Sequence, residues 1–445
     1  MKFVIAPDSY KGSLSSIKVG ESMARAIRKE WPEAEICALA MADGGEGTVE
    51  AIVSSTGGKV VHTTATGPLG TLVESYWGIS GADEQTAVLE AANVCGLAMV
   101  AEDRRNPLHT TSRGLGELLL SALNAGKRSF IIGLGGSATN DGGMGLLSAL
   151  GAEFRDTSGK QLAGYGRDLE AVAAIDFAGL DPRLAESDIV VASDVTNPLC
   201  GPEGCSFIFG PQKGADAELV QAMDHYMAHY AKLIERHLGT TFQGLPGSGA
   251  AGGLGFALRT LGARLVPGAQ VVAEAVRLDA HLADADWVIT GEGMSDAQTL
   301  YGKLPLHVAT AARRAGARCL LLSGSIGSDS GSLYETFDGC FSAVPRPADL
   351  AVCMRDAAEN VYTACRQIVR LIRAAGSRSL DGTAGVGART AAAAGHDAGA
   401  AAAGLDAQGS SASFVDGAAQ PPARPGDVPG RGTQPNSRAD GGQSC

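Results

Sequence analysis

Several short glycine-rich turns in this chain carry acids, hydroxyls, amides or lysines, which are the groups that bind phosphate. The fullest turn, residues 133–143, lies between the apolar run 130–132 and a helical pattern over 144–150. Backbone N–H groups in such a strand-to-helix turn point at open space beside the positive end of a helix, which favours an anion. The turn therefore predicts a phosphate site, to which we assign Gly135, Gly136, Ser137, Thr139, Asn140 and Asp141.

Five further turns have the same character. They cover residues 8–13, 41–48, 193–199, 246–255 and 290–303. Most of them follow an apolar run that reads as a buried strand, and open α/β sheets bind ligands at the carboxyl ends of their parallel strands. Any one of them could be an ordinary loop between a strand and a helix. Six in one chain favour a shared phosphate site.

Strands alternate with helical patterns along the chain, which indicates an α/β fold with a parallel sheet. The first helix is a clear example, because Ile17, Met23, Ile27 and Trp31 share one face at helical spacing. Ser13, Ser15 or Ser16 can cap it, so Lys11 stands just before a helix N-terminus.

Taken together, these motifs resemble the class I glycerate kinase family. The matching segments run in the family's order from residue 1 to about 372, and they are 6–15, 42–48, 135–143, 193–201, 247–255 and 290–293. The resemblance implies phosphorylation of D-glycerate by ATP with Mg²⁺, with transfer to O2 favoured. It also implies a flavodoxin-like, Rossmann-like parallel-sheet domain from residues 1–59 and 281–373. A second α/β domain, residues 60–280, would be inserted into it, with the active site in the cleft between them.

Phosphoryl transfer needs positioned phosphates, neutralised oxygen charge and an acceptor for the hydroxyl proton. We expect Mg²⁺ at two or more of Asp194, Asp43 and Glu292. Asp194 is the expected base because it directly follows a buried strand. Lys11 and Asp296 are further catalytic candidates, and Asp296 could instead cap a helix.

The remaining assignments concern the two substrates. Glycerate is a small carboxylate, which suits Ser9, Lys11 and the start of the first helix, and we add Asp8 and Asp43 to this group. For ATP, Gly291, Glu292 and Lys303 join the residues of the 133–143 turn.

Two alternatives compete with a kinase. Gly133-x-Gly135-x-x-Ala138 fits the dinucleotide fingerprint of an NAD(P)-dependent oxidoreductase loosely. A catalytically weakened nucleotide-binding or sensory homologue is the other, because Met294 stands where the family has Arg, a residue that binds phosphate bidentately. Ser295, Tyr10 and His307 also depart from the family's pattern. A P-loop kinase is excluded because no GxxxxGK[ST] occurs.

Composition sets the remaining expectations. The net charge of −12 argues against nucleic acid and anionic membranes as partners, and nine scattered cysteines without CxxC are typical of a cytoplasmic protein. No apolar stretch of membrane-spanning length occurs. The oligomeric state stays open, with a homodimer as one option. Residues 376–445 are rich in Ala, Gly, Pro and Ser, which predicts a low-complexity, disordered tail.

Overall fold

The structure is a computed structural model that describes the backbone of residues 1–382 and the side chains of residues 1–375. The last helix, α15 (Ala357–Gly382), continues past residue 376. The predicted tail, 376–445, therefore begins inside a helix, and residues 383–445 lie outside the described residues.

The first sheet is parallel throughout and has the order β15-β13-β11-β1-β2. Its strands are β1 (Lys2–Ile5), β2 (Glu35–Ala38), β11 (Trp287–Thr290), β13 (Arg318–Ser323) and β15 (Gly339–Ser342). Counted along the sheet, this is the 2-1-3-4-5 order of flavodoxin-like folds. The predicted fold class is confirmed, and the strand order reverses between β1 and β11.

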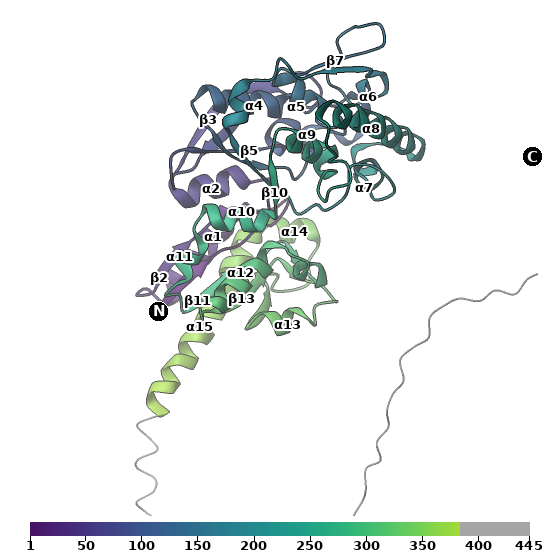
Figure 1. Cartoon of the computed structure of the whole chain (residues 1–445). Helices are drawn as coiled ribbons and strands as arrows, with labels where there is room; N and C mark the ends of the chain where they lie inside the picture. The colour runs from purple at the N-terminus through teal and green to yellow at the C-terminus, as the bar shows by residue number, and fades with distance from the viewer. Residues whose placement is uncertain (383–445) are drawn as a thin grey trace, which may run out of the picture. The chain divides into compact units, whose positions relative to one another are not determined.

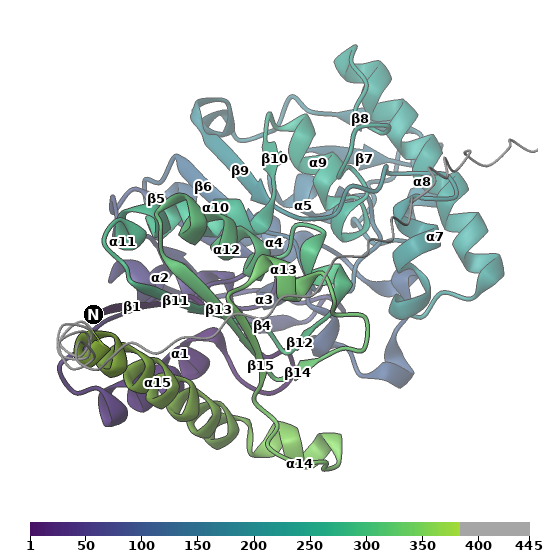
Figure 2. The same cartoon turned by 90° about the horizontal axis from the view of Figure 1, so that it is seen from below.

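Both faces of this sheet are buried, which is why its strands read as continuous apolar runs. Phe3 and Ile5 face α1 (Ser16–Glu30) and α15, whereas Val4 and Ala6 face the opposite way. Figure 2 shows α1 and α15 on one face of the sheet and α10 to α12 on the other. The bounds of this second group are α10 (Gly268–Ala275), α11 (Leu278–Leu282) and α12 (Leu304–Arg314).

The second sheet has the order β10-β9-β6-β5-β4-β3, parallel from β10 to β5 and antiparallel at β4 and β3. Its strands are β3 (Lys59–Thr66), β4 (Leu72–Ile79), β5 (Thr86–Glu90), β6 (Ser129–Gly133), β9 (Asp188–Ala192) and β10 (Arg264–Val266). All of them come from the chain between β2 and β11, as expected for an inserted α/β domain. The domain boundaries at 59/60 and 280/281 stay a prediction.

Two helices lie between the sheets, α2 (Thr48–Thr56) and α10, and Figure 1 shows both in the middle of the fold. Val88 of β5 shares one hydrophobic core with Val4, Ile52 of α2 and Val272 of α10. The two sheets are therefore held together by apolar packing through α2 and α10. The carboxyl ends of β1 and β11 lie beside this packing of α2 and α10 between the sheets.

Other helices cover the second sheet away from the first. They include α4 (Arg113–Asn124), α5 (Met144–Ala149), α8 (Ala217–Leu238) and α9 (Leu254–Thr260). The helical pattern predicted over residues 144–150 is confirmed as α5. None of the helices in the described part of the chain is long and apolar enough to cross a membrane.

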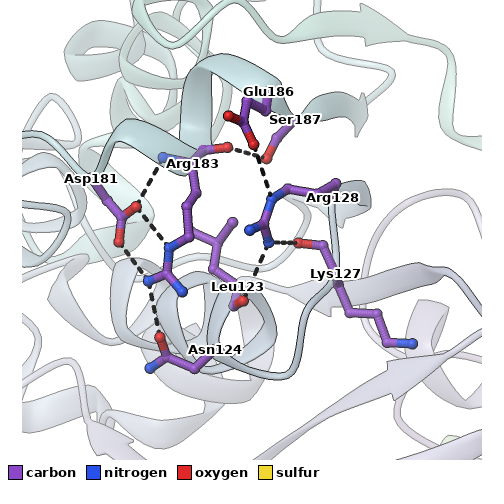
Figure 3. Close-up of polar contacts among 8 residues, drawn as sticks. All are labelled: Leu123, Asn124, Lys127, Arg128, Asp181, Arg183, Glu186 and Ser187. Carbon is purple, nitrogen blue, oxygen red and sulfur yellow. Dashed lines mark hydrogen bonds and ion pairs between the residues drawn. The ribbon is translucent and has the colours of Figure 1, made fainter.

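A network of paired charges lies at the amino ends of β6 and β9, the edge opposite the carboxyl ends (Figure 3). The Arg183 guanidinium donates to both carboxylate oxygens of Asp181, at 2.9 and 2.6 Å, and to Asn124 Oδ1 at 2.9 Å. Arg128 lies 3.8 Å from Glu186 and donates to the carbonyl of Leu123 at the end of α4. These contacts fasten α4 to the short helix Pro182–Glu186 that leads into β9.

Candidate active site

A polar cleft of about 680 Å³ opens where β1 and β11 end, the switch point of the first sheet. Six of the predicted site residues line it, and they are Asp8, Ser9, Lys11, Asp43, Glu292 and Lys303. They come from the loops after β1, β2 and β11, so they are brought together from distant parts of the chain. The start of α1 also lines the cleft, through Ser15 and Ser16.

Like charges crowd this cleft. Burial, together with the nearby carboxylates of Asp43 and Glu292, raises the pKa of Asp8 well above its usual value. The backbone N–H of Ser9 donates to Asp8 Oδ1 at 2.7 Å. This hydrogen bond and the charge of Lys11 both lower the pKa of Asp8, but burial and the neighbouring carboxylates raise it by more. Such crowding of acids is typical of a site that binds cations or moves protons.

Glu292 is the best-anchored acid of the group. Its side chain is buried and accepts hydrogen bonds from Thr299 Oγ1 at 2.6 Å and Ser295 Oγ at 3.0 Å. Lys303 Nζ lies 3.4 Å from its other oxygen. Ser295, one of the departures from the family's pattern, therefore gives Glu292 a hydroxyl donor that an apolar residue would lack.

Gly291 lets the strand ends approach one another. A Cβ atom at this position would lie 1.8 Å from the carbonyl oxygen of Leu322 on β13, which no side chain can accommodate. Its own carbonyl accepts the backbone N–H of Asp8 at 2.8 Å. Gly291 thus holds the loop carrying Asp8 beside the loop carrying Glu292, and its predicted role in ATP binding stays a prediction.

Four further residues of the cleft were not predicted from the sequence, and they come from strands of the second sheet, from α2 and from the short helix Ala92–Cys95. Glu90, Glu50, Tyr76 and Asn93 also line the cleft. Glu90 is buried at the end of β5 and accepts the backbone N–H of Gly47 and of Val49 at the start of α2. Burial, and secondly Glu50, raise the pKa of Glu90 to about 8. An acid directly after a buried apolar strand was the signal used for Asp194, and it could have found Glu90.

The predicted phosphate turn is largely closed. The side chains of Ser137, Thr139, Asn140 and Asp141 are buried, and only Gly136 is exposed in the 135–141 segment. Asp141 accepts from Ser112 Oγ and N, both at 2.7 Å, and from two backbone N–H groups at the start of α5. In this structure these side chains hold the second sheet's loops together, and their predicted role in ATP binding stays a prediction.

Lys213 completes this buried group. Its Nζ donates to the carbonyl of Thr139 at 2.6 Å and to Ser137 Oγ at 3.2 Å, and burial lowers its pKa to about 8. The amide nitrogen of Asn140 donates to Ser206 Oγ at 2.9 Å. The turn is thereby held by Lys213 and Ser206, two side chains from later in the chain.

Asp194 and Asp296 lie outside the cleft lining. Asp194 follows β9 and accepts the backbone N–H of Gly268 at 2.8 Å, while partial burial raises its pKa to about 6, with a smaller contribution from Asp43. Asp296 accepts the N–H of Gln298 at 2.8 Å and forms a capping box with Thr299. Asp296 therefore has the geometry of the capping alternative, and its catalytic role stays a prediction. Asp194 lies close enough to the cleft acid Asp43 to be influenced by its charge.

The acids fit Mg²⁺ by their chemistry. In residues 1–375 no three His, Cys, Asp or Glu side chains are gathered as a ready metal centre. Mg²⁺ is usually held by one or two carboxylates together with substrate phosphates and waters, so a complete protein cage is not needed. Asp8, Asp43 and Glu292 offer hard oxygen ligands whose mutual repulsion a bound cation would relieve.

A flavodoxin-like sheet packed through α2 and α10 against a second sheet, with an acid- and lysine-lined cleft at its switch point, is the architecture of an α/β enzyme. Comparison with known proteins gives the particular family. The family model described as "Glycerate kinase family" matches residues 3–373. The chain therefore belongs to the glycerate kinase family, and it is an enzyme of the phosphotransferase class.

Individual relatives are similar in sequence to this chain over nearly their whole length. A glycerate kinase of Bacillus subtilis is 45% identical over 84% of this chain and 98% of its own. A glycerate 2-kinase of Escherichia coli is 45% identical over 83% and 97%. A solved structure from Salmonella typhimurium LT2 that carries the name glycerate kinase 2 superposes with a TM-score of 0.76, at 46% identity, over 85% of this chain and 99% of its own. The predicted family is confirmed.

Proposed function

We propose that this chain transfers the terminal phosphoryl group of ATP, with Mg²⁺, to O2 of D-glycerate and yields 2-phosphoglycerate and ADP. The observation that carries the proposal is the single cleft that gathers Asp8, Lys11 and Glu292 from separate loops. The family supports a kinase, and the names of the relatives support glycerate as the acceptor.

The glycerate carboxylate would lie near Ser9 and Lys11. Lys11 is exposed at the cleft, and the backbone N–H groups at the start of α1 are a further anion-binding feature. Glycerate's two hydroxyls would then face the acids. Asp43, predicted in this group, lines the same cleft.

One acid must accept the proton of the attacking hydroxyl. We keep Asp194 as the proposed base, because a carboxylate whose pKa is about 6 combines basicity with ionisation near neutral pH. Asp8 is the rival, since it lines the cleft and its pKa is also raised. Glu292 and Lys303 would hold phosphate-bound Mg²⁺ and phosphate oxygens, and Mg²⁺ would neutralise charge on the transferred group.

A coupled assay tests the proposal. Purified chain with ATP, Mg²⁺ and D-glycerate should release ADP and form phosphoglycerate, and a chelator should stop the reaction. NMR of the product assigns O2 or O3. Folded protein that releases no ADP above a control without glycerate would contradict the proposal and favour the weakened homologue, whereas reduction of NAD(P) would favour the oxidoreductase.

A further inference from the structure

We propose that an apolar pocket next to the cleft binds the adenine and ribose of the phosphate donor. The pocket has a volume of about 870 Å³, within the range of ligand sites for drug-sized molecules. It lies beyond the carboxyl ends of β11, β13 and β15, whereas the Gly135–Asp141 turn belongs to the second sheet. The inference rests on the proposed function and assigns the nucleoside to the first sheet.

The pocket and the cleft adjoin each other. Lys11, Ser13, Gly293 and Met294 line both. A molecule with an apolar, planar end and a polyanionic end could therefore reach both spaces at once, with its phosphates directed past Met294 toward Glu292 and Lys303. A nucleoside triphosphate has a planar, largely apolar base at one end and a charged triphosphate at the other. Glycerate has no apolar part and needs only the cleft.

The lining of the pocket suits a nucleoside. One wall is the segment Val344–Ala348 with its two prolines, and another is α14 (Leu350–Arg355) with Cys353 and Met354. Figure 2 shows α14 next to the start of α15, beyond β15 and the short strand β14 (Ser325–Ile326). Met and aliphatic side chains pack well against a flat ring because they are polarizable and adapt their shape.

A few polar groups are placed at the same pocket. The half-buried amide of Asn360 lines it, and an amide offers the paired donor and acceptor that match an adenine edge. Ser13 Oγ donates to the carbonyl of Met354 at 2.8 Å, which fastens α14 to the loop carrying Lys11. This bond fixes one wall of the pocket beside the cleft.

The half-buried thiol of Cys353 provides a direct test that does not depend on turnover. The full chain is treated with iodoacetamide, with and without Mg²⁺ and the non-hydrolysable analogue AMP-PNP, and alkylation is followed by peptide mass spectrometry. At about ten times its Kd the nucleotide should slow modification of Cys353 about tenfold. Cys37 and Cys340, both half-buried outside the pocket, are internal controls whose rates should not change.

The same measurement identifies the occupant. Adenosine should protect Cys353, and inorganic tripolyphosphate should not. An unchanged rate with AMP-PNP, or protection by tripolyphosphate alone, overturns the inference. Faster alkylation after deletion of residues 383–445, without nucleotide, also overturns it, because the chain's own C-terminal segment would then be the occupant.

A pair of variants on α14 adds a kinetic test. Cys353→Trp fills the pocket and should raise the KM for ATP at least about tenfold, with the KM for glycerate unchanged. Ala351→Trp adds the same side chain at an exposed position of the same helix outside the pocket and should leave both unchanged. Equal ATP KM values in the two folded variants overturn the inference. Protection of Cys353 by AMP-PNP in a protein without kinase activity would support the nucleoside pocket while contradicting the proposed function.

Discussion

The charged network around Arg183 and the cleft around Asp8 differ in how their acidic side chains are neutralised. In the network around Arg183, each carboxylate meets a cation, and the guanidinium of Arg183 lowers the pKa of Asp181. In the cleft, Asp8, Asp43 and Glu292 lie close to one another, and the pKa of Asp8 is raised. The first region lies at the amino ends of β6 and β9, and the second at carboxyl ends of strands.

The difference separates scaffold from site. Paired charges neutralise each other and have little tendency to bind a ligand. Crowded carboxylates repel one another, and a bound cation or a protonated substrate reduces this repulsion. A protein keeps such an arrangement where function requires it.

The largest expected effect is on turnover. Asp194→Asn should lower kcat at least about a hundredfold, because an amide cannot accept the hydroxyl proton that a positioned base takes up. Steady-state kinetics and a melting curve on the same preparation measure this. A folded variant with near-normal kcat would remove Asp194 from the reaction and leave Asp8 as the base.

Lys11 should affect binding rather than turnover. Lys11→Ala should raise the KM for glycerate about tenfold with kcat nearly unchanged, because a charge-assisted contact made equally in the ground and transition states is uniform binding. Lys160→Ala, in an exposed turn far along the chain, serves as the control and should change neither constant. An effect of Lys11→Ala confined to kcat would place Lys11 on the transferred phosphoryl group.

The same substitution in the two regions should shift stability in opposite directions. Asp8→Asn should raise Tm by a few degrees at neutral pH and lower activity, because it removes a crowded charge. Asp181→Asn should lower Tm slightly and leave kcat unchanged, because it removes the partner of Arg183. Differential scanning fluorimetry without ligands makes the comparison, and a fall in Tm for both variants would contradict it.

Glu90 gives the smallest effect, and it depends on pH. Because the folded pKa of about 8 lies above the ordinary value of 4.5, the folded state binds more protons between these values, so Glu90 makes stability fall as pH rises from about 4.5 to about 8. Glu90→Gln, which resembles the protonated form, should match the parent protein in Tm at pH 4.5 and exceed it at pH 9. Parallel Tm curves for the two proteins across this range would show that Glu90 does not titrate there.

The sequence by itself determined much of the fold. The strand at Trp287–Thr290 and the first helix, capped by Ser15, lie where their patterns predicted them, because apolar runs and serine caps act over a few neighbouring residues. The same local logic marked Asp8, Asp43 and Glu292 as acids at strand ends. Six predicted site residues then meet in one cleft, since the ends of parallel strands lie at the same edge of a sheet.

Only the tertiary structure decided which turns face a ligand. The 133–143 turn has the richest chemistry in the sequence, yet Asn140 and Asp141 are buried because Ser112, Ser206 and Lys213 pack around the turn from distant segments. Glu90 lines the cleft because the end of β5 lies beside the start of α2. Local spacing carries no information on which segment covers which turn, and burial, which fixes the pKa and reach of each polar group, depends on that choice.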